Sequence, residues 1–237
     1  MAMPKFEKNE RGKILDISLI SKVSIELNHG VFKVLNNGVT LNLRGIGAFY
    51  EAYDKHSIKH SLFITSHKII STSSRSEVLK VTFESDAFPQ LNQLYLNKWQ
   101  ILHCWTDPTL GATIIELTRL GERFFLDNGV EFIKIGLPKL NDVIKILQFT
   151  PEKFKFANGT VLDISNSIIK YHIETGRGTS GSPILNLNCE ALGIFYEEEK
   201  SNGLNEHKQI TQLSQLDQTA FTLCHVLMVY FDDFNER

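Results

Sequence analysis

Short apolar segments, rich in β-branched and aromatic residues, alternate with turn residues along most of the chain. Examples are VSIEL, GVFKVL, SLFITS, VLKVTF, TIIEL and SIIKYHI. Such segments predict β-strands, and the intervening NHG, NNG, DNG and ANGT sequences are typical of hairpins and turns. Many strands at this short spacing favour an all-β barrel or sandwich.

Two segments show helical spacing instead of alternation. Residues 11–23 are the weaker candidate. The stronger one runs from about residue 212 to residue 234, where apolar residues recur at the helical period. This C-terminal helix either docks on the barrel or presents its apolar face to a partner protein.

The composition fits a globular protein. The chain has 237 residues, which suits one large all-β domain or two small domains that share an interface. Its hydrophobic fraction of 42% is enough for a full core. The net charge of −2, with mixed signs, gives no basis for nucleic-acid binding. The longest apolar run, LCHVLMVYF, is too short to cross a bilayer, so we expect no membrane span.

The three cysteines are widely spaced and form no Cys-x-x-Cys pair. The sequence therefore indicates neither a disulfide framework nor a zinc site, and His56 and His60 have no further ligand nearby. The N-terminus lacks the apolar core of a signal peptide. We accordingly expect an intracellular protein, cytoplasmic or nuclear, that needs no metal or other cofactor.

A glycine- and serine-rich turn, ETGRGTSGSPIL (residues 174–185), stands directly before an apolar strand. A serine nucleophile has to protrude so that its hydroxyl meets a carbonyl, and flanking glycines allow a tight turn and a close approach. Backbone N–H groups of such a turn can converge into an oxyanion hole. Considered alone, the turn fits a catalytic serine and an ordinary Gly-Ser loop equally well.

The surroundings of this turn resemble a known family. GTSGSP (residues 178–183), followed by an apolar strand, a turn and the strand LGIF, resembles the nucleophile region of the trypsin-like, chymotrypsin-fold serine peptidases, in particular their intracellular DegP/HtrA-like branch. The resemblance, which covers about residues 44–210, implies that Ser180 is the nucleophile and that the N–H groups of Gly178 and Ser180 form the oxyanion hole. The strand SLFITS leads to His67 and resembles the family's strand ending in Thr-Ala-Ala-His, so His67 would be the general base.

The acid of the family's catalytic triad is missing from its expected position. The matching stretch, DPTLGATIIELT, has Gly111 where the family has aspartate. Loss of this carboxylate costs about 10⁴ in turnover in well-studied serine peptidases, yet leaves a residual rate. Asp107 either reaches His67 from its loop or only begins a turn before Pro108. Otherwise another acid or a water orients His67, or the protein is a pseudopeptidase.

The resemblance also indicates where a substrate would lie. Glu174 corresponds to the base of the primary pocket, and Tyr196 and Glu197 lie on the strand expected to flank the substrate. The carboxylates of Glu174 and Glu197 favour a substrate with a basic side chain. Alternatively, Glu174 is a solvent-exposed strand residue. Thr179 stands where secreted trypsins have the acid that pairs with a newly cut N-terminus, so control would come from a partner, from oligomerisation or from a loop.

We therefore predict an all-β protein of two Greek-key, six-stranded β-barrels with a C-terminal helix. An N-terminal extension (residues 1–25) precedes a first barrel with the base (26–120), a second barrel with the nucleophile (121–211) and a helix with a tail (212–237). The expected function is endopeptidase action on a protein or peptide through a Ser-His pair. One alternative is a catalytically impaired pseudopeptidase that binds proteins or peptides, and another is a polyprotein-processing domain that cleaves itself once.

Overall fold

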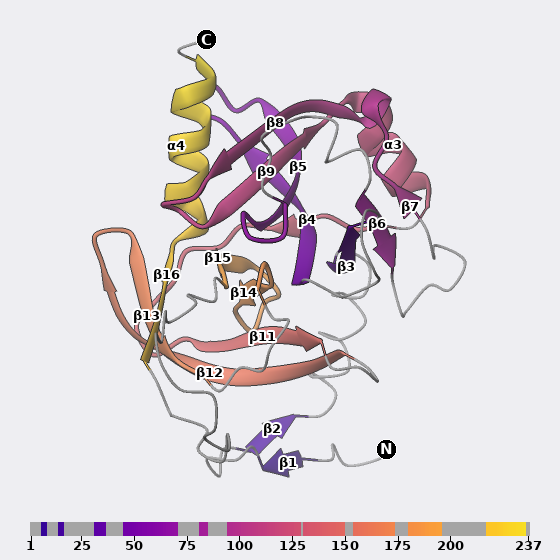
Figure 1. Ribbon diagram of the computed structural model, residues 1–237. Coiled ribbons are helices and arrows are strands. Elements are labelled where there is room, and N and C mark those ends of the chain that lie inside the picture. Colours follow the sequence, from indigo (N-terminus) through magenta and orange to yellow (C-terminus); the bar gives the residue numbers. More distant parts are fainter. Residues whose placement is uncertain are drawn as a thin grey trace, which may run out of the picture.

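The computed structural model describes residues 6–8, 14–16, 31–36, 45–70, 81–84, 94–128, 130–149, 154–173, 180–195 and 217–235. Their strands form a two-stranded, an eight-stranded and a six-stranded sheet. Figure 1 shows the six-stranded sheet below the eight-stranded one. The all-β architecture expected from the sequence is confirmed. Within the described ranges, no helix is both long and apolar enough to cross a membrane.

The first sheet supplies the strand that leads to His67. Its strand order is β7-β6-β3-β4-β5-β9-β8, and β10 pairs in parallel with β4. In β5, Leu62 and Ile64 pack into one hydrophobic cluster and Phe63 into another, so both faces of this strand are covered. The strands are β3 (Val31–Asn36), β4 (Gly45–Tyr53), β5 (Lys59–Ser66), β6 (Val81–Glu84), β7 (Leu94–Tyr95), β8 (Ile101–Asp107), β9 (Ala112–Leu117) and β10 (Ile133–Lys134).

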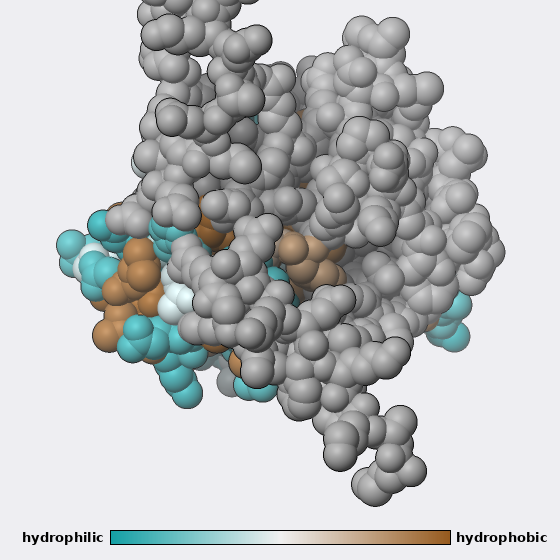
Figure 2. Space-filling model, turned by 90° about the horizontal axis from the view of Figure 1, so that it is seen from below, coloured by the Kyte–Doolittle hydropathy of each residue, from teal (hydrophilic) through white to brown (hydrophobic). Residues whose placement is uncertain are grey.

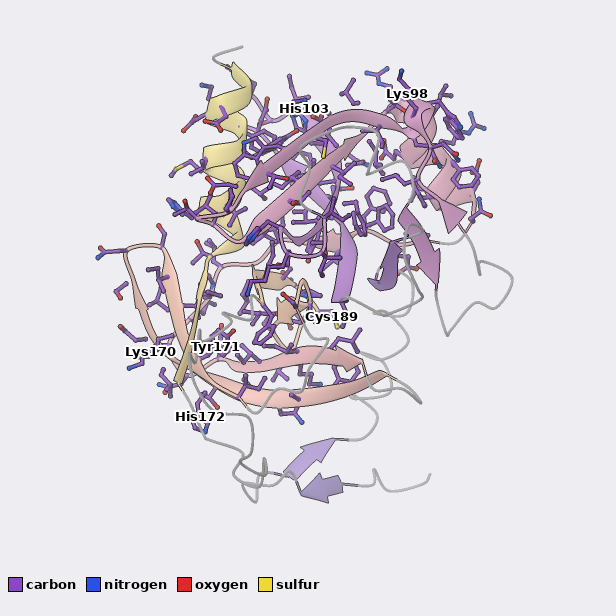
Figure 3. The ribbon with its side chains drawn as sticks, in the orientation of Figure 1. Lys98, His103, Lys170, Tyr171, His172 and Cys189 are labelled. Atoms are coloured by element: carbon purple, nitrogen blue, oxygen red, sulfur yellow. The ribbon has the colours of Figure 1, made fainter. Side chains whose placement is uncertain are left out.

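The second sheet follows the turn with Ser180 and has the order β15-β14-β11-β12-β13-β16. Its strands are β11 (Val143–Phe149), β12 (Phe154–Ser165), β13 (Ile168–His172), β14 (Pro183–Leu185), β15 (Ala191–Ile194) and β16 (Asp217–Phe221). In β13, buried Tyr171 lies between exposed Lys170 and half-buried His172, as labelled in Figure 3. This alternation is that of a strand with one face on the core.

One predicted turn is wrong. The sequence ANGT (residues 157–160) lies inside β12, where it pairs with both β11 and β13. A Cβ on Gly159 would come within 2.3 Å of the carbonyl oxygen of His172. The glycine is therefore needed for a close approach of two strands, and not for a turn.

The helices differ from the prediction in their bounds. Residues 14–16, part of the first predicted helix, form β2 (Ile14–Asp16), which pairs with β1 (Phe6–Lys8). The C-terminal helix α4 (Leu223–Asn235) begins well after residue 212, because residues 217–221 form β16 and pair with β13. The sequence analysis did not predict α3 (Arg119–Asp127), whose N-terminus is capped by the side chain of Thr118 accepting the N–H of Gly121 at 3.0 Å. A short 3₁₀ helix spans Lys98–Gln100.

Helix α4 docks on the first sheet, beside β8 and β9 in Figure 1. Its residues Leu223, Val226, Leu227 and Tyr230 belong to a buried cluster that also includes residues of both sheets. The indole of Trp105 in β8 donates a 2.9 Å hydrogen bond to the carboxylate of Asp233. This packing leaves the helix fixed against the sheet and not merely adjacent to it.

The view from below in Figure 2 shows hydrophobic side chains exposed among hydrophilic ones. In β12, Leu162 and Ile164 are 42% and 37% exposed. Single exposed hydrophobic residues are common on soluble proteins.

Candidate active site

His67 directly follows β5, and the backbone around it is held by several hydrogen bonds. The N–H of His67 donates to the carbonyl oxygen of Gly111 at 3.1 Å. The carbonyl oxygen of Ser66 accepts the N–H groups of Ile69 and Ile70 at 3.0 and 3.3 Å, which turns the chain after the strand. The imidazole is half-buried, and its Nδ1 atom is shielded from solvent. His67 therefore directly follows a strand that pairs with β4 and β9 on its two sides, and its role as the base stays a prediction.

Gly111 lies beside this base, where the family resemblance places the triad acid. It ends the turn between β8 and β9, and the neighbouring Ala112 pairs with Ser66. Its φ is +71°, a left-handed conformation that glycine adopts without strain. The position next to His67 is thus occupied by a residue that offers a backbone carbonyl oxygen and no carboxylate.

Asp107 has a role within its own turn. Its Oδ1 atom accepts the N–H of Thr109 at 2.7 Å and the N–H of Leu110 at 3.1 Å. This is the arrangement by which an aspartate stabilises a turn. The hydrogen bonds support the interpretation of Asp107 as a turn residue, and a contact between its carboxylate and His67 stays a prediction.

Ser180 lies in the turn before β14 and is only 6% exposed. Its carbonyl oxygen accepts the N–H of Ile46 in β4 at 2.9 Å, so the turn is bonded to the first sheet. The Oγ atom of Ser180 is buried and makes no hydrogen bond to any residue in the described part of the chain. His67 is among those residues, so the structure shows no hydrogen bond between the hydroxyl of Ser180 and the candidate base, and the activation of Ser180 by His67 stays a prediction.

The turn with Ser180 packs directly on the end of β5. Gly181 has a φ of +88°, and a Cβ there would lie 2.0 Å from the carbonyl oxygen of Ile46 and 2.9 Å from the N atom of Ser66. Because Gly181 follows Ser180 and Ser66 precedes His67, the backbone neighbours of the two candidate residues are in contact. The structure thus brings the two positions to one seam between the sheets.

Four other predicted site residues, Gly178, Glu174, Tyr196 and Glu197, lie outside the described residues, so their roles stay predictions. The N–H of Gly181 is described, and it donates to the carbonyl oxygen of Phe195 at 2.8 Å. This N–H is therefore engaged in the fold and is not a donor for an oxyanion.

The sequence analysis missed a buried carboxylate in β9. Glu116 is 5% exposed and lies 2.6 Å from the Nδ1 atom of His60 in β5. Its other oxygen accepts the hydroxyl hydrogen of Tyr230 in α4, also at 2.6 Å. Burial and this hydrogen bond raise the pKa of Tyr230. Glu116 thereby ties α4 to the first sheet, and no local pattern in the sequence signals it.

A second unexpected group is the buried lysine of β11. Lys145 is 1% exposed, and its Nζ atom has no hydrogen-bond partner among the described residues. Burial lowers the pKa of Lys145, an effect that Cys189 partly opposes. Cys189 is labelled in Figure 3 near the turn between β14 and β15. A charged amine without a partner is an unfavourable group to bury.

Comparison with solved structures identifies the fold. The chain is similar to the active form of the Rv3671c protease from M. tuberculosis, with a TM-score of 0.56 and 12% identity over 89% of this chain and 83% of that one. The inactive form gives the same TM-score and identity, with 89% and 92% of the two chains covered. The fold is chymotrypsin-like.

The serine endoprotease from Yersinia pestis is similar too, with a TM-score of 0.57 and 10% identity over 89% of this chain and 65% of that one. No protein-family model matches the sequence. At these identities the likeness concerns the chymotrypsin-like fold, and the chemistry has to be argued from this chain's own residues.

Proposed function

We propose that the protein is a serine endopeptidase in which Ser180 is the nucleophile and His67 the general base. The observation that carries the proposal is the contact between the turn of Ser180 and the strand end of His67, with Gly181 against Ser66. The Oγ atom of Ser180 forms no hydrogen bond to His67 in this structure, and the proposal requires that the two groups approach each other when a substrate binds.

The proposed reaction is an acyl transfer from the substrate to Ser180 and then to water. The Oγ atom of Ser180 attacks the carbonyl carbon of a peptide bond while His67 accepts its proton, and the same imidazole then protonates the leaving amine. Water hydrolyses the resulting acyl-enzyme. We assign the oxyanion hole to the N–H groups of Gly178 and Ser180, and a basic side chain of the substrate to Glu174, Tyr196 and Glu197, as the family resemblance implies.

The missing acid sets the expected rate. Gly111 cannot stabilise the imidazolium that forms on His67, and in serine peptidases this loss reduces turnover by about 10⁴, roughly 5.5 kcal/mol of transition-state stabilisation. We therefore propose slow turnover. The specific observation of a glycine beside the base also favours a second candidate function, a pseudopeptidase that binds a protein or peptide without cleaving it.

Labelling with a fluorophosphonate tests these proposals. We expect labelling of the wild type that disappears in Ser180→Ala and persists in the matched control Ser182→Ala, because Ser182 is buried in the same turn but is not the proposed nucleophile. Gly111→Asp should accelerate labelling, because it places a carboxylate beside His67 that can stabilise the imidazolium. Aspartate tolerates the left-handed conformation at this position better than most residues.

The outcomes separate the two candidates. Labelling of Gly111→Asp alone would identify a pseudopeptidase that has lost its acid. Labelling that survives Ser180→Ala, or that no variant shows, would contradict the assignment of Ser180 as the nucleophile.

A further inference from the structure

The seam between the sheets includes the first residues of β4. The pairing of β4 with β5 starts at Gly47 and Thr65. The N–H of Ile46, one residue earlier in β4, donates to the carbonyl oxygen of Ser180 at 2.9 Å. The carbonyl oxygen of Ile46 accepts the hydroxyl hydrogen of Thr65 at 2.7 Å. Ile46 is therefore bonded both to the turn of the proposed nucleophile and to a side chain of β5.

Thr65 also lies against the turn of Ser180 directly. A Cβ on Gly181 would come within 2.6 Å of the Oγ1 atom of Thr65, so this oxygen packs against the backbone of Gly181. Gly181 directly follows Ser180, and Thr65 stands two residues before His67. One hydroxyl group thus contacts the turn of the proposed nucleophile from the strand that leads to the proposed base.

Packing alone does not require a hydroxyl at this position. The side chain of Thr65 is fully buried, and the residues before it in β5, Leu62, Phe63 and Ile64, belong to the core. Valine has the same shape as threonine and would fill the site without a polar group to bury. A buried hydroxyl is tolerated where it forms a hydrogen bond, and that bond has a preferred direction. The hydroxyl therefore adds a directed link to Ile46.

We propose that Thr65 is a positioning residue that keeps Ser180 in place relative to His67. The inference rests on the proposed function and adds to it a residue that acts through the site and not on the substrate, because Thr65 is fully buried. Moving the turn away from β5 would break the bond between Ile46 and Ser180, and moving Ile46 with the turn would break its bond to Thr65. These two links hold the nucleophile's turn at the strand of the base before a substrate binds.

The rate at which diisopropyl fluorophosphate labels Ser180 tests this role. It is measured in the Gly111→Asp chain, where labelling should be fastest, after adding Thr65→Val or Thr65→Ser. Valine keeps the shape and removes the hydrogen bond, so we expect labelling to slow about threefold to tenfold. Serine keeps the hydroxyl and should restore the rate to within about twofold of the parent. Tyr230→Phe is the matched control, because it removes a buried hydroxyl hydrogen bond that joins α4 to β9 instead, and it should label as the parent does.

A second comparison separates positioning from a general loss of structure. In His67→Ala the imidazole is absent, so the position of Ser180 relative to it no longer matters. Thr65→Val should then leave the residual labelling rate unchanged, although it slows labelling when His67 is present. A merely structural defect would slow labelling to the same extent in both backgrounds.

Hydrogen–deuterium exchange of the Ile46 amide gives a readout that does not depend on catalysis. In the otherwise unchanged chain, Thr65→Val should speed exchange of this amide severalfold, because its bond to Ser180 opens more often. Thr65→Ser should leave the exchange rate as it is.

The outcomes distinguish this inference from the proposed function. Unchanged labelling in Thr65→Val, no rescue by serine, or an equal slowing with and without His67 would overturn the inference. If the Gly111→Asp chain itself is not labelled at Ser180, the proposed function fails, and exchange of the Ile46 amide decides on Thr65 by itself. Faster exchange in Thr65→Val would then support Thr65 as the residue that holds the turn, and unchanged exchange would overturn it.

Discussion

Replacing Gly181 with alanine tests whether the turn of Ser180 is held against the first sheet as described. The added Cβ would lie 2.0 Å from the carbonyl oxygen of Ile46, 2.6 Å from the Oγ1 atom of Thr65 and 2.9 Å from the N atom of Ser66. Two of these three atoms belong to the backbone, so the strain cannot be relieved by rotating a side chain. The turn or the ends of β4 and β5 would have to move.

The cost of Gly181→Ala follows from two terms. A non-glycine residue at a φ of +88° is strained by about 1–2 kcal/mol. Movement of the turn also weakens the hydrogen bonds from Ile46 to Ser180, 2.9 Å, and from Thr65 to Ile46, 2.7 Å, each worth about 0.5–1.5 kcal/mol. We expect the free energy of unfolding to fall by about 2–5 kcal/mol in total.

Urea unfolding of Gly181→Ala and of the matched control Gly136→Ala measures this difference. A Cβ on Gly136 would meet only side-chain atoms, the nearest being the Cβ of Glu190 at 2.8 Å and its Oε2 at 3.0 Å. The Cβ of Glu190 moves only with its own backbone, so the control should also lose stability, but Gly136 lacks the left-handed conformation of Gly181 and the loss should be smaller. Fluorophosphonate labelling of Ser180 should also slow in Gly181→Ala. An equal or smaller loss of stability than in Gly136→Ala would refute the described seam.

Three further substitutions probe single groups. Tyr230→Phe removes a hydrogen bond to the buried carboxylate of Glu116 and should lower the free energy of unfolding by about 1.5–3 kcal/mol in urea titrations; no change would mean that the bond does not form. Lys145→Met should raise that free energy by about 1–3 kcal/mol at neutral pH, whereas Lys170→Met, at an exposed position of β13, should change it little. Because burial lowers the pKa of Lys145, the unfolded chain binds more protons than the folded one between the lowered pKa and 10.5, so the gain should shrink as pH rises through this interval, and a gain that stays constant with pH would refute the linkage. Asp107→Asn keeps the oxygen that accepts its two turn hydrogen bonds and removes the charge, so labelling should continue at the wild-type rate if Asp107 is a turn residue; a large fall would identify it as the acid.

The positions of His67 and Ser180 could be predicted because local chemistry determines them. An apolar strand that ends at a histidine, and a glycine turn that precedes an apolar strand, are both visible over a few residues. The chymotrypsin-like fold that follows from them is confirmed by the solved structures that the chain resembles. Gly111 stands directly before β9, as the sequence predicts, and its correspondence to the family's acid stays a prediction.

The remaining features depend on contacts between distant residues. The pattern from residue 212 onward fits a helix, but pairing with β13 makes residues 217–221 a strand. Glu116 could not be assigned a role from the sequence, since its partners His60 and Tyr230 are 56 and 114 residues away. A glycine that permits a close strand contact, such as Gly159, also looks like a glycine in a turn until the neighbouring strand is known.

The central claim is that the imidazole of His67 activates the hydroxyl of Ser180 across the seam between the sheets. Its most direct test is the rate at which diisopropyl fluorophosphate modifies Ser180, measured by peptide mass spectrometry. Two proteins are compared, the variant Gly111→Asp and the double variant Gly111→Asp with His67→Ala. We expect the adduct on the peptide that contains Ser180, with the rate in His67→Ala lower by a factor of 10² or more. An adduct on another residue, or equal rates with and without the imidazole, would contradict the account.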